Sequence, residues 1–144
     1  MNPVTKPASA PIQEPHDRDE RVTRGAEDRA LARPIQQFAL ADEVEALRQE
    51  EGWRKTGHSA KTLVKHAGLR IVLIALKQGT RIKEHQSEGT VSIHAISGQL
   101  QLHVDEQTLH VPAGGLLVLE RGVAHDVEAL EDSAFVLSVG LDPA

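Results

Sequence analysis

GTRIKEHQSEGTVSIHAISG (residues 79–98) and GGLLVLERGVAH (residues 114–125) are the two stretches of this chain that decide its fold. The first contains His85 and His94 and the second contains His125, among glycines that suit tight turns. In the first stretch, polar and apolar residues alternate from Thr90 to Ala95, which is typical of a strand with one buried face. The two stretches therefore predict a small β-structure in which His85 and His125 are the first candidates for a functional site.

Composition narrows the possible functions. The 144 residues, 40% of them hydrophobic, predict one domain with a modest core, and the net charge of -5 argues against a general binder of nucleic acid or anionic membranes. Cysteine is absent, which excludes disulfides, thiolate nucleophiles and sulfur-ligated metals. Without an apolar run long enough for a signal peptide or a membrane span, we expect a cytoplasmic protein.

The chain divides into two parts of different composition. Residues 1–34 contain five of the seven prolines and almost no apolar periodicity, so we expect a disordered tail. Residues 35–144 are expected to form a single domain, with the barrel itself over about residues 60–140.

One helix and eight strands are expected in the folded part. Leu40, Val44 and Leu47 share one helical face, and Gly52 suits a helix end, which predicts a helix over residues 42–51. Short strands at regular spacing, without helices between them, indicate an antiparallel sandwich or closed barrel. The expected strands are 62–64, 70–77, 90–96, 99–104, 108–111, 116–119, 125–127 and 134–139.

Strand alternation sorts the histidines by face. His94, His103 and His110 each lie opposite the apolar side of their strands and are expected on the outer surface. His125 shares the apolar face with Val127 and is expected to point inward. A buried imidazole needs a partner, which is a metal, a ligand, a water or another group of the protein.

Basic residues surround the other candidate histidine. If the segment after Gly79 is extended, Arg81, Lys83 and His85 lie on one side. That side would favour an anionic small molecule such as a carboxylate, although charges on an edge strand are also common as solvated groups that prevent aggregation.

The first stretch resembles the first motif of the cupin family, whose members are small β-barrels of jelly-roll type. The glycines Gly79 and Gly98 and the histidine His85 stand at matching places. Ser87 stands where the family has a second histidine, and Val91 where it has a glutamate.

The second stretch resembles the second cupin motif. Gly114, Gly122 and His125 match, whereas Glu120 replaces a proline and Ala129 an asparagine. The resemblance implies an all-β fold, a cupin-type jelly-roll barrel with one short N-terminal helix. It also implies a homodimer, the assembly that many cupins form.

The resemblance also implies a divalent metal, often Fe, Mn, Zn or Ni, held by three histidines and a glutamate. Of those ligands only His85 and His125 are present, and Glu88 is the nearest carboxylate that could join them. Two imidazoles alone make a weak site, so a complete metal site is not expected.

Three functions stay open. The favoured one is a small-molecule-binding cupin, a sensor or accessory protein, whose ligand contacts His85, His125, Val91, Ile93 and Val127. The second is an enzyme acting on a small metabolite, either metal-dependent as in dioxygenase and isomerase members of the family, or metal-free with a histidine as general base. The third is an interaction module whose partner docks on the outer face or the tail.

Overall fold

The computed structural model describes residues 33–141, with Glu84 and His85 through their backbone alone. Most of the predicted disordered tail, residues 1–32, lies outside the described residues. The helices of the described part are α2 (Leu40–Arg48) and α3 (Glu51–Thr56). Its strands are β1 (His58–Lys65), β2 (Leu69–Leu76), β3 (Arg81–His85), β4 (Thr90–Ser97), β5 (Gln99–Val104), β6 (Gln107–Pro112), β7 (Leu116–Leu119), β8 (His125–Ala129) and β9 (Ser133–Gly140).

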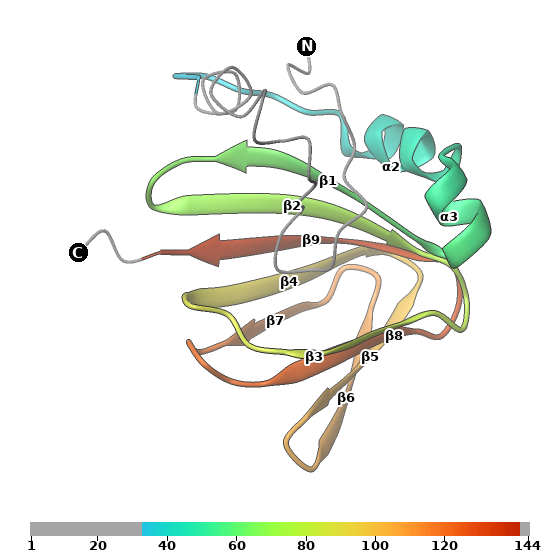
Figure 1. Cartoon of the computed structure of the whole chain (residues 1–144), viewed down its shortest axis with the longest axis vertical. Helices are drawn as coiled ribbons and strands as arrows, with labels where there is room; N and C mark the ends of the chain where they lie inside the picture. Colours follow the sequence, from blue (N-terminus) through green and yellow to red (C-terminus); the bar gives the residue numbers. More distant parts are fainter. Residues whose placement is uncertain (1–32, 142–144) are drawn as a thin grey trace.

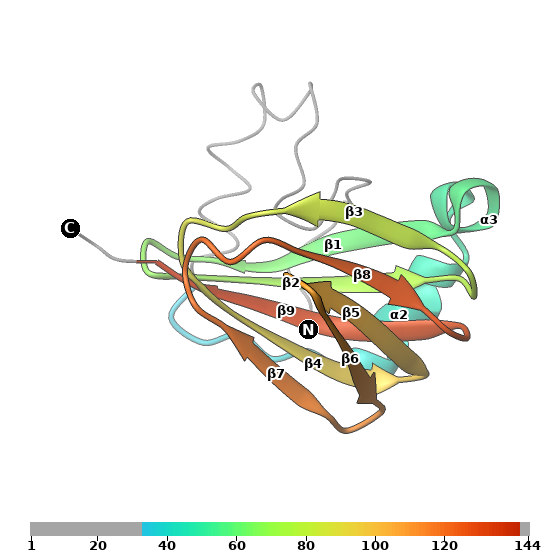
Figure 2. The same cartoon turned by 90° about the horizontal axis from the view of Figure 1, so that it is seen from below.

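The strands form two antiparallel sheets that face each other (Figures 1 and 2). One sheet has the order β1-β2-β9-β4-β7 and the other the order β3-β8-β5-β6. Strand β9, the last in the chain, pairs with β2 and β4, so distant parts of the sequence meet in the middle of the first sheet. This arrangement confirms the predicted all-β jelly roll.

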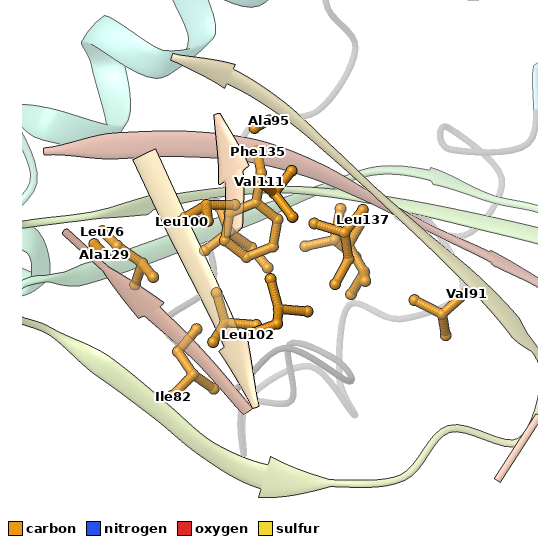
Figure 3. Close-up of a cluster of buried hydrophobic side chains, with 14 of the residues drawn as sticks. Leu76, Ile82, Val91, Ala95, Leu100, Leu102, Val111, Ala129, Phe135 and Leu137 are labelled. Carbon is orange, nitrogen blue, oxygen red and sulfur yellow. The ribbon is translucent and has the colours of Figure 1, made fainter. Parts of the chain in front are cut away.

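The core lies between the sheets and consists of their inward-facing aliphatic side chains (Figure 3). Phe135 of β9 is fully buried there, together with Ile93 of β4 and Leu102 of β5. These positions follow the period of two that the sequence shows, because alternate residues of each strand point inward. Burial of this apolar surface supplies most of the driving force for folding.

A second cluster forms where α2 covers the outer face of β1, β2 and β9 (Figure 1). Val44 and Leu47 of α2 pack on Leu73 of β2 and Ala134 of β9. The helix expected over residues 42–51 is therefore present but ends earlier, and a second short helix follows because the backbone of Glu50 is extended.

Strand β3 was not predicted. Its sequence, RIKEH, offers one apolar residue, Ile82, which is buried opposite Val127 of β8. The register with β8 also shifts between Ile82 and His85, so the alternation expected along Arg81, Lys83 and His85 is interrupted, and their sharing of one side stays a prediction. Such a bulge breaks the period of two that the prediction assumed.

Strand β7 is an edge of the five-stranded sheet. Two of its side chains, Leu116 and Val118, are 64% and 56% exposed. A homodimer would cover apolar surface of this kind, and the homodimer stays a prediction. Within residues 33–141, no helix combines the length and the apolar character needed to cross a membrane.

Candidate functional site

The register brings the two candidate histidines together. His85 at the end of β3 pairs with His125 at the start of β8, and His125 pairs on its other side with Val104 at the end of β5. Cross-strand neighbours lie about 4.5–5.5 Å apart. We call this end of the barrel, where β3 ends and β8 begins, the histidine end.

His125 is buried, with 1% of its surface exposed, as the alternation predicted. Its Nδ1 lies 3.2 Å from the carbonyl oxygen of Val123. Because a carbonyl only accepts, Nδ1 carries the hydrogen of that bond, and in the neutral ring Nε2 is the nitrogen with a lone pair. Hydrogen bonding to the backbone thus fixes both the orientation and the tautomer of this imidazole.

The loops of the two motifs are tied together beside His125. The Gly122 N–H donates to the carbonyl of Ser87 over 3.0 Å, and the Gly89 N–H donates to the Ser87 hydroxyl over 3.2 Å. Gly122 has a φ of 83°, which is strained for other residues. Ser87 therefore links the loop after β3 to the loop before β8. It stands at the position where the resemblance implies a second histidine ligand.

The predicted lining residues lie at two depths. Val91 of β4 is nearest the histidine end, because it pairs with Val139 near the end of β9. Ile93 and Val127 lie one step deeper in the barrel, where both are fully buried in the core. Contact of these three side chains with a ligand stays a prediction.

The metal ligands that the resemblance implies are incomplete among the described side chains. Val91 is an apolar core residue at the glutamate position, and Glu88 is exposed in the loop between β3 and β4. Within the described residues, no three His, Cys, Asp or Glu side chains gather as a metal site. This donor set does not fit a cupin site with four protein ligands, and binding of an ion by His85 and His125 stays a prediction.

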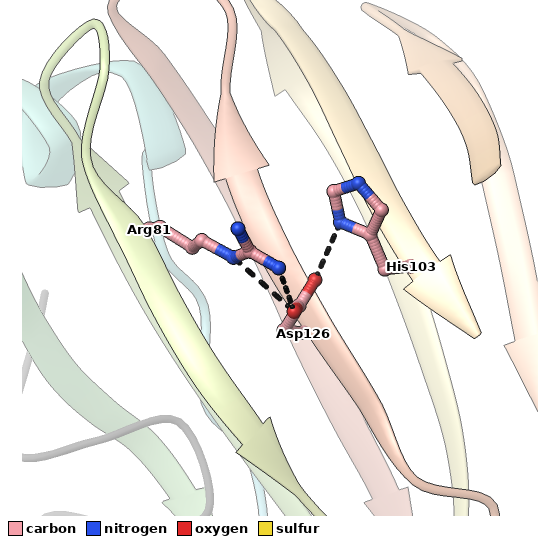
Figure 4. A network of polar contacts seen from close by, with 3 residues as sticks. All are labelled: Arg81, His103 and Asp126. Carbon is pink, nitrogen blue, oxygen red and sulfur yellow. Dashed lines mark hydrogen bonds and ion pairs between the residues drawn. The ribbon is translucent and has the colours of Figure 1, made fainter. Parts of the chain in front are cut away.

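A polar network that was not predicted lies on the outer face of the four-stranded sheet β3-β8-β5-β6 (Figure 4). The Asp126 carboxylate accepts hydrogen bonds from Arg81 Nη2 at 2.6 Å and from Arg81 Nε at 3.2 Å, and it lies 2.7 Å from His103 Nδ1. An outward position for His103 was predicted. The contacts of Asp126 with His103 and Arg81 were not predicted, because they depend on the pairing of β8 with β5 and β3.

Two opposing effects set the pKa of Asp126. Burial raises the pKa of this carboxyl, but the hydrogen bonds from Arg81 and His103 outweigh it, and the pKa lies below its ordinary value of 3.8. The carboxylate therefore stays ionised on the sheet surface and holds three strands together.

Asp126→Asn should lower the free energy of unfolding at pH 7 by about 1–2 kcal/mol, the scale of charge-assisted hydrogen bonds. Because the folded-state pKa of Asp126 is lowered, its contribution is complete above about pH 4 and is lost as the pH falls through the folded pKa. Thermal melts at pH 7, 5 and 3 should show a smaller loss of stability in acid for this variant than for wild type. Glu106→Gln, at an exposed turn, serves as the control. Equal acid sensitivity of Asp126→Asn and wild type would contradict the role of the network.

A second histidine faces inward at the opposite end of the barrel. His58 begins β1, pairs with the core residue Leu76 and shares the face of Ala60. Its Nε2 is buried, and burial lowers the pKa of its ring below 6.5. The first expected strand began at residue 62, so His58 was not assigned to a face.

The barrel, with two motif loops meeting at one end, defines a jelly roll. Residues 72–140 match the family model described as a cupin domain. The chain therefore carries a cupin domain over these residues. No curated protein matches the sequence.

Solved structures share this fold. A conserved protein of unknown function from Streptococcus pyogenes is 25% identical, with a TM-score of 0.64 over 79% of this chain and 94% of the other. A cupin superfamily protein from Desulfitobacterium hafniense is 15% identical, with a TM-score of 0.64 over 78% and 96%. A mutant of salicylate 1,2-dioxygenase from Pseudoaminobacter salicylatoxidans is 17% identical, with a TM-score of 0.68 over 76% of this chain and 36% of the other.

Proposed function

We propose that this protein binds a small molecule at the histidine end of its barrel, with His125 as the central polar contact. The observation that carries the proposal is the buried, inward-facing imidazole of His125, held in one tautomer by the carbonyl of Val123. In an imidazole of this tautomer Nε2 is the acceptor nitrogen, and a ligand donor would join or replace the other contact that His125 makes in the chain. Binding sites commonly combine a few such oriented polar groups with apolar side chains.

The surroundings of His125 supply the apolar part of that combination. Val104 is its neighbour on β5, and Val123, in the loop before β8, packs against the core cluster. Val91 lies on the facing sheet at the same end. We assign the ligand contacts to these residues, to His125 and to His85, whose backbone position is directly opposite His125.

Replacement of His125 tests the proposal. A thermal-shift screen of small metabolites should find compounds that stabilise the wild-type protein, by roughly 2.7 kcal/mol at a hundred times the dissociation constant. His125→Asn keeps an amide near the place of Nδ1 but removes Nε2, so we expect affinity for those compounds to fall at least roughly tenfold. His94→Asn, at an exposed position of the outer face, is the matched control and should bind like wild type.

The same preparation separates the proposal from its main alternative. Elemental analysis of protein purified without a histidine tag should find metal well below one ion per chain. One ion per chain, lost in both His125→Asn and Glu88→Ala, would replace this proposal by a metal-dependent enzyme. Equal compound binding by His125→Asn and wild type would place the ligand elsewhere and contradict the proposal.

A further inference from the structure

The inner face of the five-stranded sheet ends, at the histidine end, in one continuous cross-strand row. Each residue of the row is paired with the next across neighbouring strands, in the order β1, β2, β9, β4 and β7. In that order the row reads Lys65, Arg70, Val139, Val91 and Leu119. Its first two members are cations and its last three are aliphatic, so the row has a charged half and an apolar half.

A bulge in β1 brings Lys65 into this row. Thr62 pairs with Val72, whose side chain belongs to the core, and Lys65 pairs with Arg70 two positions along β2. On β1 the same step takes three residues, because the register shifts between Thr62 and Val64. Strict alternation would place Lys65 on the opposite face from Thr62, and the bulge places both on the inner face.

Thr62 adds a buried hydroxyl next to the charged half of the row. It is 8% exposed, and its Oγ1 is buried without a hydrogen-bond partner among the described residues. A buried hydroxyl is normally satisfied, and one that is not calls for a water or a ligand group. Thr62 lies one step below Lys65 on β1 and beside the strand that carries Arg70.

Arg70 faces the same region. It lies on the face of β2 that carries Val72 and Ile74 into the core, and its Nε is buried. Arg70 and Lys65 also interact with other groups of the chain, so a ligand would join or replace those contacts. Long cationic side chains at the rim of an apolar layer keep their stems in the layer and direct their charge toward its opening.

We propose that the ligand of the histidine end is a small organic carboxylate, bound through its anionic group by Arg70 and Lys65. The Thr62 hydroxyl donates a hydrogen bond to a carboxylate oxygen, and the apolar body of the ligand lies along Val139, Val91 and Leu119. This inference rests on the proposed function and names its substrate class. The site takes a carboxylate rather than a free phosphate because a planar guanidinium matches a carboxylate in two parallel bonds and the aliphatic half of the row requires an apolar body.

Matched acids and amides test the charge requirement. Benzoate and hexanoate are titrated into the full chain at constant ionic strength, beside benzamide, hexanamide and inorganic phosphate, with binding followed by calorimetry and thermal shift. We expect saturable binding of at least one of the two acids, with its amide and phosphate at least tenfold weaker. Binding of neither acid, equal binding of acid and amide, or a response to phosphate alone would each overturn the proposal.

Three variants test the location. Arg70→Met should weaken the acid at least tenfold, whereas Arg54→Met, an exposed arginine of α3, should leave the affinity unchanged. Thr62→Val should also weaken the acid, yet it should melt at the same or a higher temperature than wild type because it removes a hydroxyl without a partner. Retained affinity in Arg70→Met, or in a folded Thr62→Val, would overturn the assignment.

The outcomes also separate this inference from the proposed function. Neutral compounds that bind in a way that depends on His125, while neither acid binds, would overturn the carboxylate and leave the small-molecule site intact. Failure of every compound in both screens would contradict both.

Discussion

Phe135→Ala is expected to lower the free energy of unfolding by about 3–5 kcal/mol, the range for removing a buried aromatic ring. Phe135 is fully buried in the core between the sheets, on the central strand β9 (Figure 3). Its neighbours on adjacent strands, Ile74 and Ala95, are also buried and belong to the same cluster, so the space left by the ring cannot be filled from the surface. Urea unfolding at 25 °C measures the change.

The other phenylalanine provides the control. Phe38 is only partly buried and packs against the smaller cluster under α2. Phe38→Ala should therefore cost less, about 1–2 kcal/mol, in line with partial burial. A cost for Phe38→Ala equal to that for Phe135→Ala would contradict the assignment of the main core to the space between the sheets.

Gly98→Ala is expected to destabilise the fold by about 2–5 kcal/mol, because a positive φ and a steric clash act together. Gly98 joins β4 to β5, and so one sheet to the other, with a φ of 84°. A Cβ at this position would lie 2.4 Å from the carbonyl oxygen of Asp132 and 2.6 Å from the Cα of Ser133. The backbone before β9 would have to move to admit it.

Gly114→Ala separates the two contributions. Gly114 has a φ of 88°, but a Cβ there would meet no atom within 4 Å. This control therefore carries the conformational cost alone, about 1–2 kcal/mol. Thermal and urea unfolding of both variants give the difference, and equal losses would show that the contact of Gly98 with Asp132 and Ser133 is unimportant.

Much of the fold could be predicted from the sequence because the strands alternate clearly. The segment over residues 90–104 reads as two strands with Val91, Ile93, Leu100 and Leu102 inward, and the structure confirms both strands and these faces. Strand β3 could not be predicted in this way, since a single apolar residue, Ile82, gives no period. Its place in the sheet comes from pairing with β8, a distant strand in the sequence. Arg81 of β3 and Asp126 of β8, which are in contact, are 45 residues apart.

The candidate site was predictable only in part for a related reason. The inward position of His125 follows from local alternation, and its backbone position opposite His85 agrees with the resemblance to cupin motifs. Lys65, Arg70 and Thr62 were not identified because a bulge changes the face of Lys65 and because their alignment depends on pairing between strands. Bulges leave no reliable trace in a single sequence, whereas they decide which side chains reach the end of the barrel.

Histidine ring spectra report directly whether a ligand contacts His125. Long-range ¹H–¹⁵N correlation spectra of the uniformly labelled protein are recorded during titration with the acid from the panel, benzoate or hexanoate, that stabilises it most. We expect saturable shifts of the His125 ring nitrogens, while the signals of His94 and His110 on the outer faces stay in place. Unchanged His125 signals, or shifts confined to the outer-face histidines, would contradict this expectation.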